Sequence, residues 1–136
     1  MNDPEYLEDA RACARFILER MRAPDGRILR TWSEGEARVA GFLEDHAALA
    51  VGLFTLYQAT GEHEWYSAAE HITRLIPRLY ADPAGGFFTT AHDAPDLVKR
   101  PKDQLDNPLP SGNSLAAEAL LWLSMYTGEP EPAELA

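Results

Sequence analysis

The sequence predicts an all-α fold built from layered helical hairpins. Two stretches, AALAVGLFTLY at 47–57 and LAAEALLWLSMY at 115–126, are almost wholly apolar, and each follows a helix that is apolar on a single face. A helix that is apolar all round must be covered on every side, whereas a striped helix can leave one face in water. The alternation therefore indicates inner helices that face one another, with striped outer helices behind them.

The first pair of helices is predicted at 4–22 and 44–60. Asp3 suits the N-cap of the first helix and Pro4 its first turn. The stripe that marks this helix as an outer one consists of Leu7, Ala10, Ala14, Ile17, Leu18 and Met21. The second helix is predicted to end at Thr60, because Gly61 suits a left-handed C-terminal cap.

The second pair is predicted to begin at His63 and at Ser114. The third helix is again striped, and Pro77 is expected to kink its last turn. Its stripe consists of Trp65, Ala68, Ala69, Ile72, Leu75, Ile76 and Leu79. The fourth helix ends at a second Thr-Gly pair, and the Pro- and Glu-rich tail at 129–136 is expected to be flexible.

The two halves of the chain read as a diverged repeat, with units at 1–61 and 62–128. RMRAPDGRILRT at 20–31 aligns with RLYADPAGGFFTT at 78–90, and LFTLYQATG at 53–61 aligns with LLWLSMYTG at 120–128. Repeats of helical hairpins bury their apolar faces against neighbouring units. Two units offer little cover for two fully apolar helices, so we expect a homo-oligomer, a dimer or trimer, or part of a larger barrel.

Composition excludes several classes of function. The 136 residues are 46% hydrophobic and carry a net charge of -10, which repels nucleic acid and anionic lipid. The apolar runs are too short for a membrane span and the first residues are acidic, so the cytoplasm is expected. Cys13 is expected in the core. No histidine pair has metal-ligand spacing and no phosphate loop occurs, so neither a metal nor a cofactor is predicted.

Two long connections, 23–43 and 82–113, are predicted to open onto the same end of the hairpin stack. They contain PDGRILRTW and GGFFTT, which indicate short extended segments. Loops of about twenty and thirty residues are usually functional or disordered. If the two inner helices are parallel, their positive N-terminal ends lie together beside these loops.

The motifs in and around these loops resemble a known family. DGRILRT, FLEDHAAL and GLFTLYQATG resemble the DGR-x-L-R, FLDDYA-x-L and GLLxLYEATG motifs of thioredoxin-domain-containing proteins of the YyaL and spermatogenesis-associated type. GGFFTTAHD, RPK and PSGNSLAA resemble the same family's GGFF-x-TA-x-D, R-x-K and PSGNS-x-AA. The similarity runs from about Tyr6 to Gly128, with the motifs in the family's order.

The resemblance implies a partial (α/α) toroid, about a third of the family's twelve-helix ring, which has the six-hairpin fold of glycosidases and sugar 2-epimerases. The family's thioredoxin-like domain has no counterpart in this sequence. The resemblance places the site where the inner helices begin. There the chain has Glu44, Asp45 and His46 where the family commonly has Asp-Asp-Tyr, so His46 departs from the pattern.

Three residues are candidates for catalysis, namely Asp45, His46 and Asp106. A carboxylate and an imidazole at the start of an inner helix can be tuned by burial to act as acid and base on a sugar. The alternative for Asp45 is capping, because a carboxylate in the first turn satisfies free N–H groups and the helix dipole. Capping is the favoured interpretation.

Five further residues are candidates for substrate binding. Trp32 can stack on a sugar ring while Arg30 and Arg100 bind hydroxyl or carboxylate groups. The alternative is that these arginines pair with Asp45, Asp103 or Asp106 and fix the loops. Ser111 and Asn113 can form a polar cradle for a ligand, although a turn that caps the fourth helix is favoured.

Two classes of function remain open from the sequence. The first is a helical module that self-associates and binds a carbohydrate ligand without catalysis. The second is a carbohydrate-active enzyme of the sugar isomerase or glycoside hydrolase type, with its acid and base at the N-termini of the inner helices.

Overall fold

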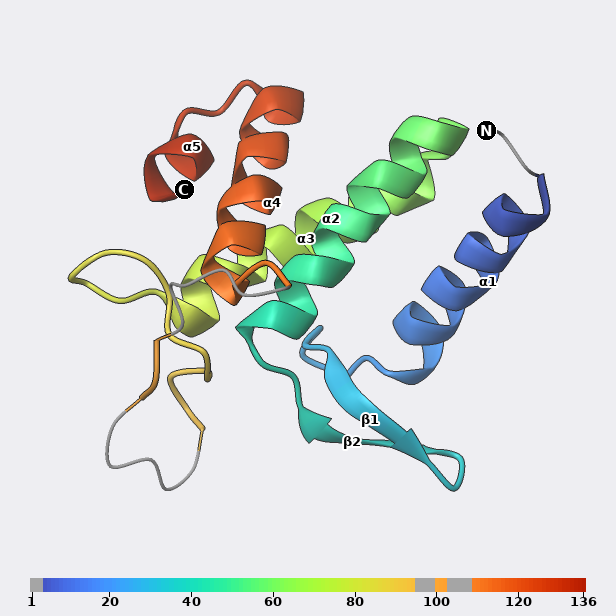
Figure 1. Cartoon of the computed structure of the whole chain (residues 1–136), viewed down its shortest axis with the longest axis horizontal. Coiled ribbons are helices and arrows are strands. Elements are labelled where there is room, and N and C mark those ends of the chain that lie inside the picture. The colour runs from blue at the N-terminus through green and yellow to red at the C-terminus, as the bar shows by residue number, and fades with distance from the viewer. Residues whose placement is uncertain (1–3, 95–99, 103–108) are drawn as a thin grey trace.

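A computed structural model describes residues 4–94, 100–102 and 109–136 (Figure 1). The chain is mostly helical, as predicted, and adds a small two-stranded antiparallel sheet. Its helices are α1 (Pro4–Arg20), α2 (Leu43–Thr60), α3 (His63–Tyr80), α4 (Gly112–Thr127) and α5 (Glu131–Leu135), and its strands are β1 (Leu29–Ser33) and β2 (Glu36–Ala40). In the described part of the chain, no helix is long and apolar enough to cross a bilayer.

The sheet is a hairpin that projects from the chain between α1 and α2 (Figure 1). Ser33 pairs with Glu36, so Glu34 and Gly35 form a two-residue turn with φ of 53° and 82°. Positive φ at both positions matches the twist of the two strands. The extended segment predicted around Leu29 is therefore present, whereas GGFFTT contributes a single bridge between Ala81 and Phe87.

The two inner helices, α2 and α4, lie side by side, and α3 lies behind them (Figure 1). They run in the same direction, because the start of α4 meets the start of α2 and their later turns also meet. A methyl group at Gly112 would lie 3.2 Å from Leu43 Cδ2. Further along, the ring of Tyr126 stacks on Phe54 with 5.6 Å between centroids.

Small side chains lie at the centre of the core. Ala47 and Ala50 of α2 and Ala116 and Ala119 of α4 are fully buried, which lets the two backbones approach closely. Larger buried side chains surround them and bury most of the apolar surface that stabilises the fold. These are Leu43, Leu53, Phe54, Trp65, Ile72, Ile76, Leu120 and Leu123.

The same turn and the same helix ending occur twice in the chain. Ala23 N–H donates to Arg27 O at 2.8 Å, and Asp82 N–H donates to Gly86 O at 3.0 Å in the equivalent turn. Each turn has a left-handed glycine, Gly26 or Gly85, and each is closed by an isolated bridge, Arg22 to Ile28 or Ala81 to Phe87. The helices that follow both end at a left-handed glycine, Gly61 in α2 and Gly128 in α4.

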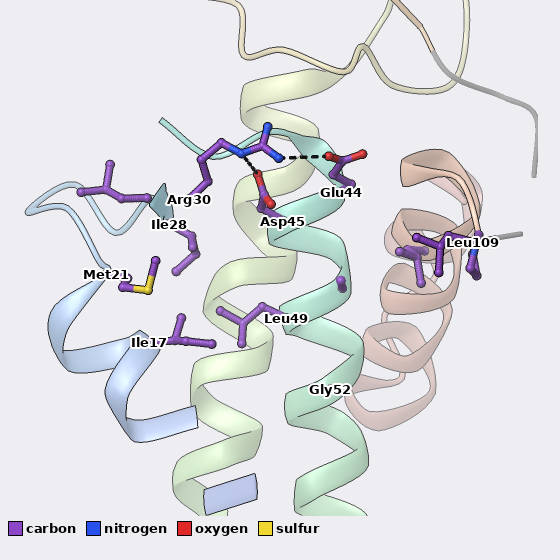
Figure 2. A pocket seen from close by; sticks show the side chains of 13 residues that line it. Ile17, Met21, Ile28, Arg30, Glu44, Asp45, Leu49, Gly52 and Leu109 are labelled. Carbon is purple, nitrogen blue, oxygen red and sulfur yellow. Dashed lines mark hydrogen bonds and ion pairs between the residues drawn. The ribbon is translucent and has the colours of Figure 1, made fainter. Parts of the chain in front are cut away.

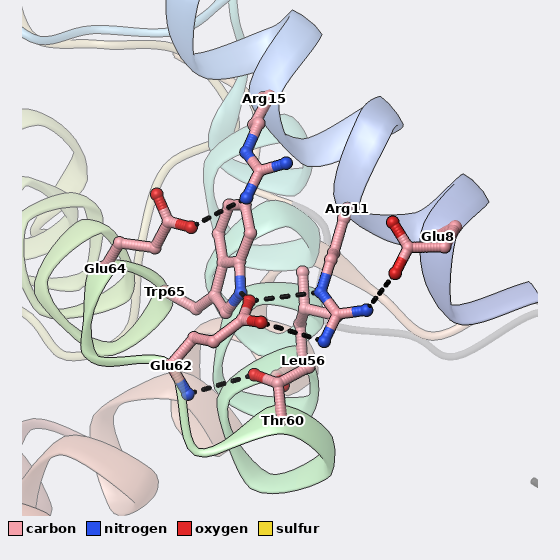
Figure 3. A network of polar contacts seen from close by, with 8 residues as sticks. All are labelled: Glu8, Arg11, Arg15, Leu56, Thr60, Glu62, Glu64 and Trp65. Carbon is pink, nitrogen blue, oxygen red and sulfur yellow. Dashed lines mark hydrogen bonds and ion pairs between the residues drawn. The ribbon is translucent and has the colours of Figure 1, made fainter. Parts of the chain in front are cut away.

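Polar contacts join α1 to the start of α3 (Figure 3). Arg11 donates to both carboxylate oxygens of Glu62, at 3.1 and 2.8 Å, and Glu62 also accepts from Trp65 Nε1 at 2.6 Å. These hydrogen bonds lower the pKa of Glu62. The guanidinium of Arg15 lies 5.3 Å from the Trp65 ring centroid.

Two predictions for α1 differ from the structure. Cys13 is exposed, so its assignment to the core was wrong. Its neighbour Ala14 is the buried residue of this helix, which turns a narrow apolar face to the rest of the chain. The helix also ends at Arg20 rather than Arg22, because Arg22 already belongs to the bridge with Ile28.

The far side of α4 and the tail also depart from expectation. Leu121 is 48% exposed and Met125 is 75% exposed, so the described residues leave one face of α4 uncovered. On α2 the exposed face consists of small or polar residues, including Ala48, Gly52 and Thr55. The tail, expected to be flexible, forms the short helix α5, in which Pro132 is buried.

Candidate functional site

The start of α2 is held by hydrogen bonds from the preceding chain and from the second loop. Asp45 Oδ2 accepts the Phe42 N–H at 2.7 Å. The carboxylate thus holds the chain at the entrance of the helix, the capping role favoured from the sequence. Leu43 N–H donates to Thr89 O at 2.9 Å, which ties the second loop to the same helix end.

Arg30 projects from β1 over this helix end (Figure 2). Its Nη2 lies 3.5 Å from Glu44 Oε1, and its Nε lies 3.7 Å from Asp45 Oδ2. The guanidinium also lies over the Phe42 ring, 4.2 Å from the centroid. Both ion-pair contacts are long, and a guanidinium has five N–H donors, so Arg30 and Glu44 keep capacity for further hydrogen bonds.

Next to this polar cluster lies an open groove of about 680 Å³ between α1 and α2 (Figure 2). One wall consists of Ile17 of α1, Met21 just after α1, Ile28 just before the hairpin and Leu29 of β1. The α2 side contributes Ala48, Leu49 and Gly52, and the remaining wall contributes Leu109, Pro110 and Leu115. The groove is therefore apolar along its length and polar at the end where α2 begins.

His46 lies behind the groove and is 1% exposed. Ile28 N–H donates to its Nε2 at 3.1 Å, so this nitrogen is the acceptor and the ring proton is on Nδ1. Nδ1 lies 3.0 Å from both Phe42 O and Tyr80 Oη, and Tyr80 Oη donates to Gly41 O at 2.9 Å. Burial lowers the pKa of His46, so at neutral pH the imidazole is uncharged and joins the hairpin, α2 and α3.

Of the three sequence candidates for catalysis, the two that the structure describes, Asp45 and His46, have different surroundings. Asp45 is at the polar end of the groove, where it already accepts a backbone hydrogen bond. His46 is enclosed, and both of its ring nitrogens have partners. Asp106 lies outside the described residues.

Ser111 and Asn113 hold the start of α4. Ser111 Oγ accepts the Ser114 N–H at 3.1 Å, as an N-cap does. Asn113 Oδ1 accepts the Phe87 N–H at 2.8 Å, and its Nδ2 donates to Phe87 O at 3.0 Å. Asn113 therefore fixes the second loop just as His46 fixes the first.

The other two binding candidates lie apart from the groove lining. Trp32 packs edge-on against Phe16 of α1, with 5.2 Å between centroids, and so attaches the hairpin to that helix. Arg100 lies over the Phe88 ring and donates to Thr90 O and Leu79 O. Of the predicted platform, Arg30 is the residue that the structure places in the groove.

Several residues of the groove and of its support were missed from the sequence. Ile17, Met21 and Leu49 were expected as ordinary packing residues, and Tyr80 was not singled out. The repeat alignment carried a signal for Ile28, since it falls opposite Phe87 in an equivalent turn. Nothing in the local sequence indicates that α1 approaches α2 in a way that leaves a groove open.

These elements define a helical domain of paired hairpins with an apolar groove at the start of an inner helix. The chain is homologous to a segment of spermatogenesis-associated protein 20. It is 35% identical to the protein of that name from Mus musculus over 138 residues, which cover 93% of this chain and 18% of the relative. For the Homo sapiens protein the identity is 33%, over 87% of this chain and 16% of the relative.

A further relative is named for an enzyme. The chain is 26% identical to an unsaturated glucuronyl hydrolase from Formosa agariphila, over 88% of this chain and 30% of that protein. No family model matches the sequence. The chain thus spans less than a fifth of its spermatogenesis-associated relatives. The homology confirms the resemblance of this helical domain to that family.

Proposed function

We propose that this chain forms part of an (α/α) toroid arrangement and acts as a self-associating, carbohydrate-binding module. The alternation of outer and inner helices, the repeated turn and the homology to a protein named as a glucuronyl hydrolase support the proposal. The observation that carries the binding function is the groove, which combines apolar walls with a polar end at Arg30, Glu44 and Asp45.

The groove suits a sugar in size and in chemistry. Its volume of about 680 Å³ lies within the range of small-molecule sites, roughly 300–1,000 Å³, which are mostly apolar with a few placed polar groups. The C–H face of a sugar would lie on Leu29 and Leu49, beside the polar end of the groove. Its hydroxyl groups would bond to Arg30 and Glu44, as charge-assisted hydrogen bonds are about twice as strong as neutral ones.

Binding without catalysis fits the geometry better than acid/base chemistry. Asp45 and His46 act here as positioning residues, since Asp45 holds the Phe42 N–H and His46 joins the hairpin to α2. Glu44 and Arg30 are the side chains that a ligand in the groove would meet.

The test is a titration of the ¹⁵N-labelled chain with a neutral hexose, an amino sugar and a hexuronic acid, followed by NMR. We expect shifts of the Leu29, Asp45 and Leu49 amides at the polar end, with binding at least about tenfold weaker in Arg30→Gln and Glu44→Gln. Arg38→Gln is the matched control, because Arg38 is on the same hairpin and pairs with Glu36 outside the groove. Equal binding by Arg30→Gln and wild type, or no shift with any sugar, would contradict the proposal.

A further inference from the structure

The two inner helices can be aligned position by position. When their C-terminal glycines, Gly61 and Gly128, are superposed in sequence, His46 falls opposite Asn113. These two residues perform the same task, since they accept the N–H groups of Ile28 and Phe87, which are themselves equivalent in the two turns. Agreement at both ends fixes the alignment of α2 with α4.

The face of α2 that packs against α4 has an equivalent face on α4, and that face is exposed. Phe54 is on this face and is 0% exposed, because it stacks on Tyr126 of α4. Its counterpart on α4 is Leu121, which is half exposed, and near it Met125 is more exposed still. We call this surface the open face of α4, and it includes Ser114, Leu121 and Met125.

The residues of α4 that contact α2 also have equivalents on α2. These equivalents mark the surface of α2 on which the open face of α4 would fit. The residues by which α4 meets α2 include Gly112, beside Leu43, and Tyr126, on Phe54. Leu115 and the fully buried Ala119 lie on the same face of the helix. The counterparts of Gly112, Leu115 and Ala119 on α2 are Asp45, Ala48 and Gly52, and all three line the groove.

We infer that α4 of a second copy of this chain docks in the groove, parallel to α2, and repeats between copies the packing of α2 against α4. This inference rests on the self-association proposed above and specifies its interface. Each copy carries both surfaces of this interface, which we call the joint. Leu121 protrudes from α4, and small residues line the groove side of α2. A side chain at Gly52 would meet no atom within 4 Å, so there is room for a large residue of the second copy.

The joint is heterologous, because the two surfaces that meet are different parts of the chain. Heterologous contacts close into rings or continue as filaments. With two hairpins in each copy, three copies would complete the six hairpins of the proposed toroid. The open face of one α4 then always fills the groove of the next copy.

The joint also completes the candidate binding site. In the packing of α2 on α4, Gly112 lets Leu43 approach within van der Waals distance and closes the top of the contact. The counterpart of Gly112 in the groove is Asp45, which lines the polar end beside Arg30. The second copy would therefore cover the apolar floor at Ala48 and Gly52 and leave the polar end open to a ligand.

Two variants disrupt the two surfaces of the joint one at a time, the open face of α4 in one and the groove in the other. Leu121→Glu places a charge on the open face and leaves the groove intact, whereas Gly52→Glu places a charge in the groove and leaves the open face intact. Tyr6→Glu is the control, because Tyr6 is an exposed aromatic residue on the outer side of α1. Circular dichroism and thermal unfolding establish that each variant folds.

The measurement is molar mass by sedimentation or light scattering across a hundredfold range of concentration. We expect three times the chain mass for wild type and Tyr6→Glu, and the single-chain mass for Leu121→Glu and for Gly52→Glu. An equimolar mixture of these two variants should form a one-to-one dimer, since one intact open face then meets one intact groove. A symmetric contact through two open faces predicts instead that Gly52→Glu still associates by itself.

The outcomes separate this inference from the proposed function. Wild-type chain with the single-chain mass at every concentration overturns both the joint and the proposed self-association. Wild-type oligomers that persist in Leu121→Glu and Gly52→Glu, or a mixture that forms no dimer, overturn the joint alone.

Discussion

The two inner helices, α2 and α4, have the same sequence pattern and opposite surroundings. Phe54 of α2 is completely buried, whereas its counterpart Leu121 of α4 is 48% exposed. Both helices are apolar, both end at a left-handed glycine, and both start beside a loop that they hold by a side chain. The difference is that α2 has an inner helix beyond it and α4 has none among the described residues.

Under the proposed assembly, a neighbouring unit would cover the apolar face that an inner helix leaves exposed. Repeat units bury their apolar faces against neighbouring units, and on α4 the face equivalent to the covered face of α2 has exposed apolar residues. The groove beside α2 is the space that α4 of another copy would fill in the proposed assembly.

Removing the two equivalent side chains should give the largest contrast. Phe54→Ala should lower the free energy of unfolding by about 3–5 kcal/mol, because it opens a cavity between α2, α3 and α4. Leu121→Ala should cost about 0.5–1 kcal/mol at concentrations where the chain is monomeric, since half of its surface is already in water. Urea unfolding followed by circular dichroism measures both changes.

Leu123→Ala serves as a control on α4 itself, because Leu123 is buried at the centre of the same helix. Its loss should resemble that of a core leucine, about 2–5 kcal/mol. Equal losses for Phe54→Ala and Leu121→Ala would show that the two faces are not as different as the structure describes.

The residues that hold the two loops should differ in their response to pH. Burial lowers the pKa of His46 below its usual 6.5, so in the window between the two values the unfolded chain binds a proton that the folded chain does not. Stability should therefore be full above about pH 7.5 and fall as the pH drops below 6.5, by up to about 1.4 kcal/mol per pH unit. Asn113, in the equivalent position, does not titrate.

His46→Asn copies the second unit into the first and should remove this slope. Unfolding free energies of wild type and variant, measured between pH 5.5 and 7.5, give the comparison. The carboxylates whose pKa values are lowered, Glu62, Asp82 and Asp93, lose their contribution in more acidic solution, below their ordinary values of 4.5 and 3.8. A slope that survives in His46→Asn would assign the effect to another group.

The smallest expected contrast is between the two helix starts. Ser111→Ala removes the hydroxyl that caps α4 and should cost about 1 kcal/mol, as loss of an N-cap does. Asp45→Ala removes the acceptor of the Phe42 N–H and should cost about 0.5–1 kcal/mol. Thermal unfolding of each variant, with exposed Ser67→Ala as control, measures the losses, and a neutral effect of Asp45→Ala would argue against its role in holding Phe42.

Much of the fold could be predicted from local sequence. The ends of α2 and α4 at Gly61 and Gly128 were predicted because glycine adopts the left-handed conformation without strain. The start of α3 at His63 was also predicted, and the starts of α2 and α4 were one or two residues off. The pairing of Arg30 with Asp45 was among the alternatives, because both flank one helix start.

The groove could not be predicted in the same way. Ile17 and Met21 line it because of the distance at which α1 lies from α2, and that distance depends on Trp32 against Phe16 and on Arg11 with Glu62. The enclosed position of His46 depends likewise on Ile28, Phe42 and Tyr80, which come from three separate segments.

The sequence alone predicted the four long helices, the glycine ends of α2 and α4, and the repeat of similar segments in the two halves of the chain. It placed the end of α1 two residues too late and did not predict α5. The predicted properties follow from backbone preferences and from the spacing of apolar residues, which act over a few neighbouring positions. The tertiary structure alone decided which apolar face is covered and that a groove opens beside α2. It also decided that His46 is buried and hydrogen-bonded to three separate segments. These properties depend on contacts between segments far apart in the chain, because burial is set by what packs against a residue and not by its own type.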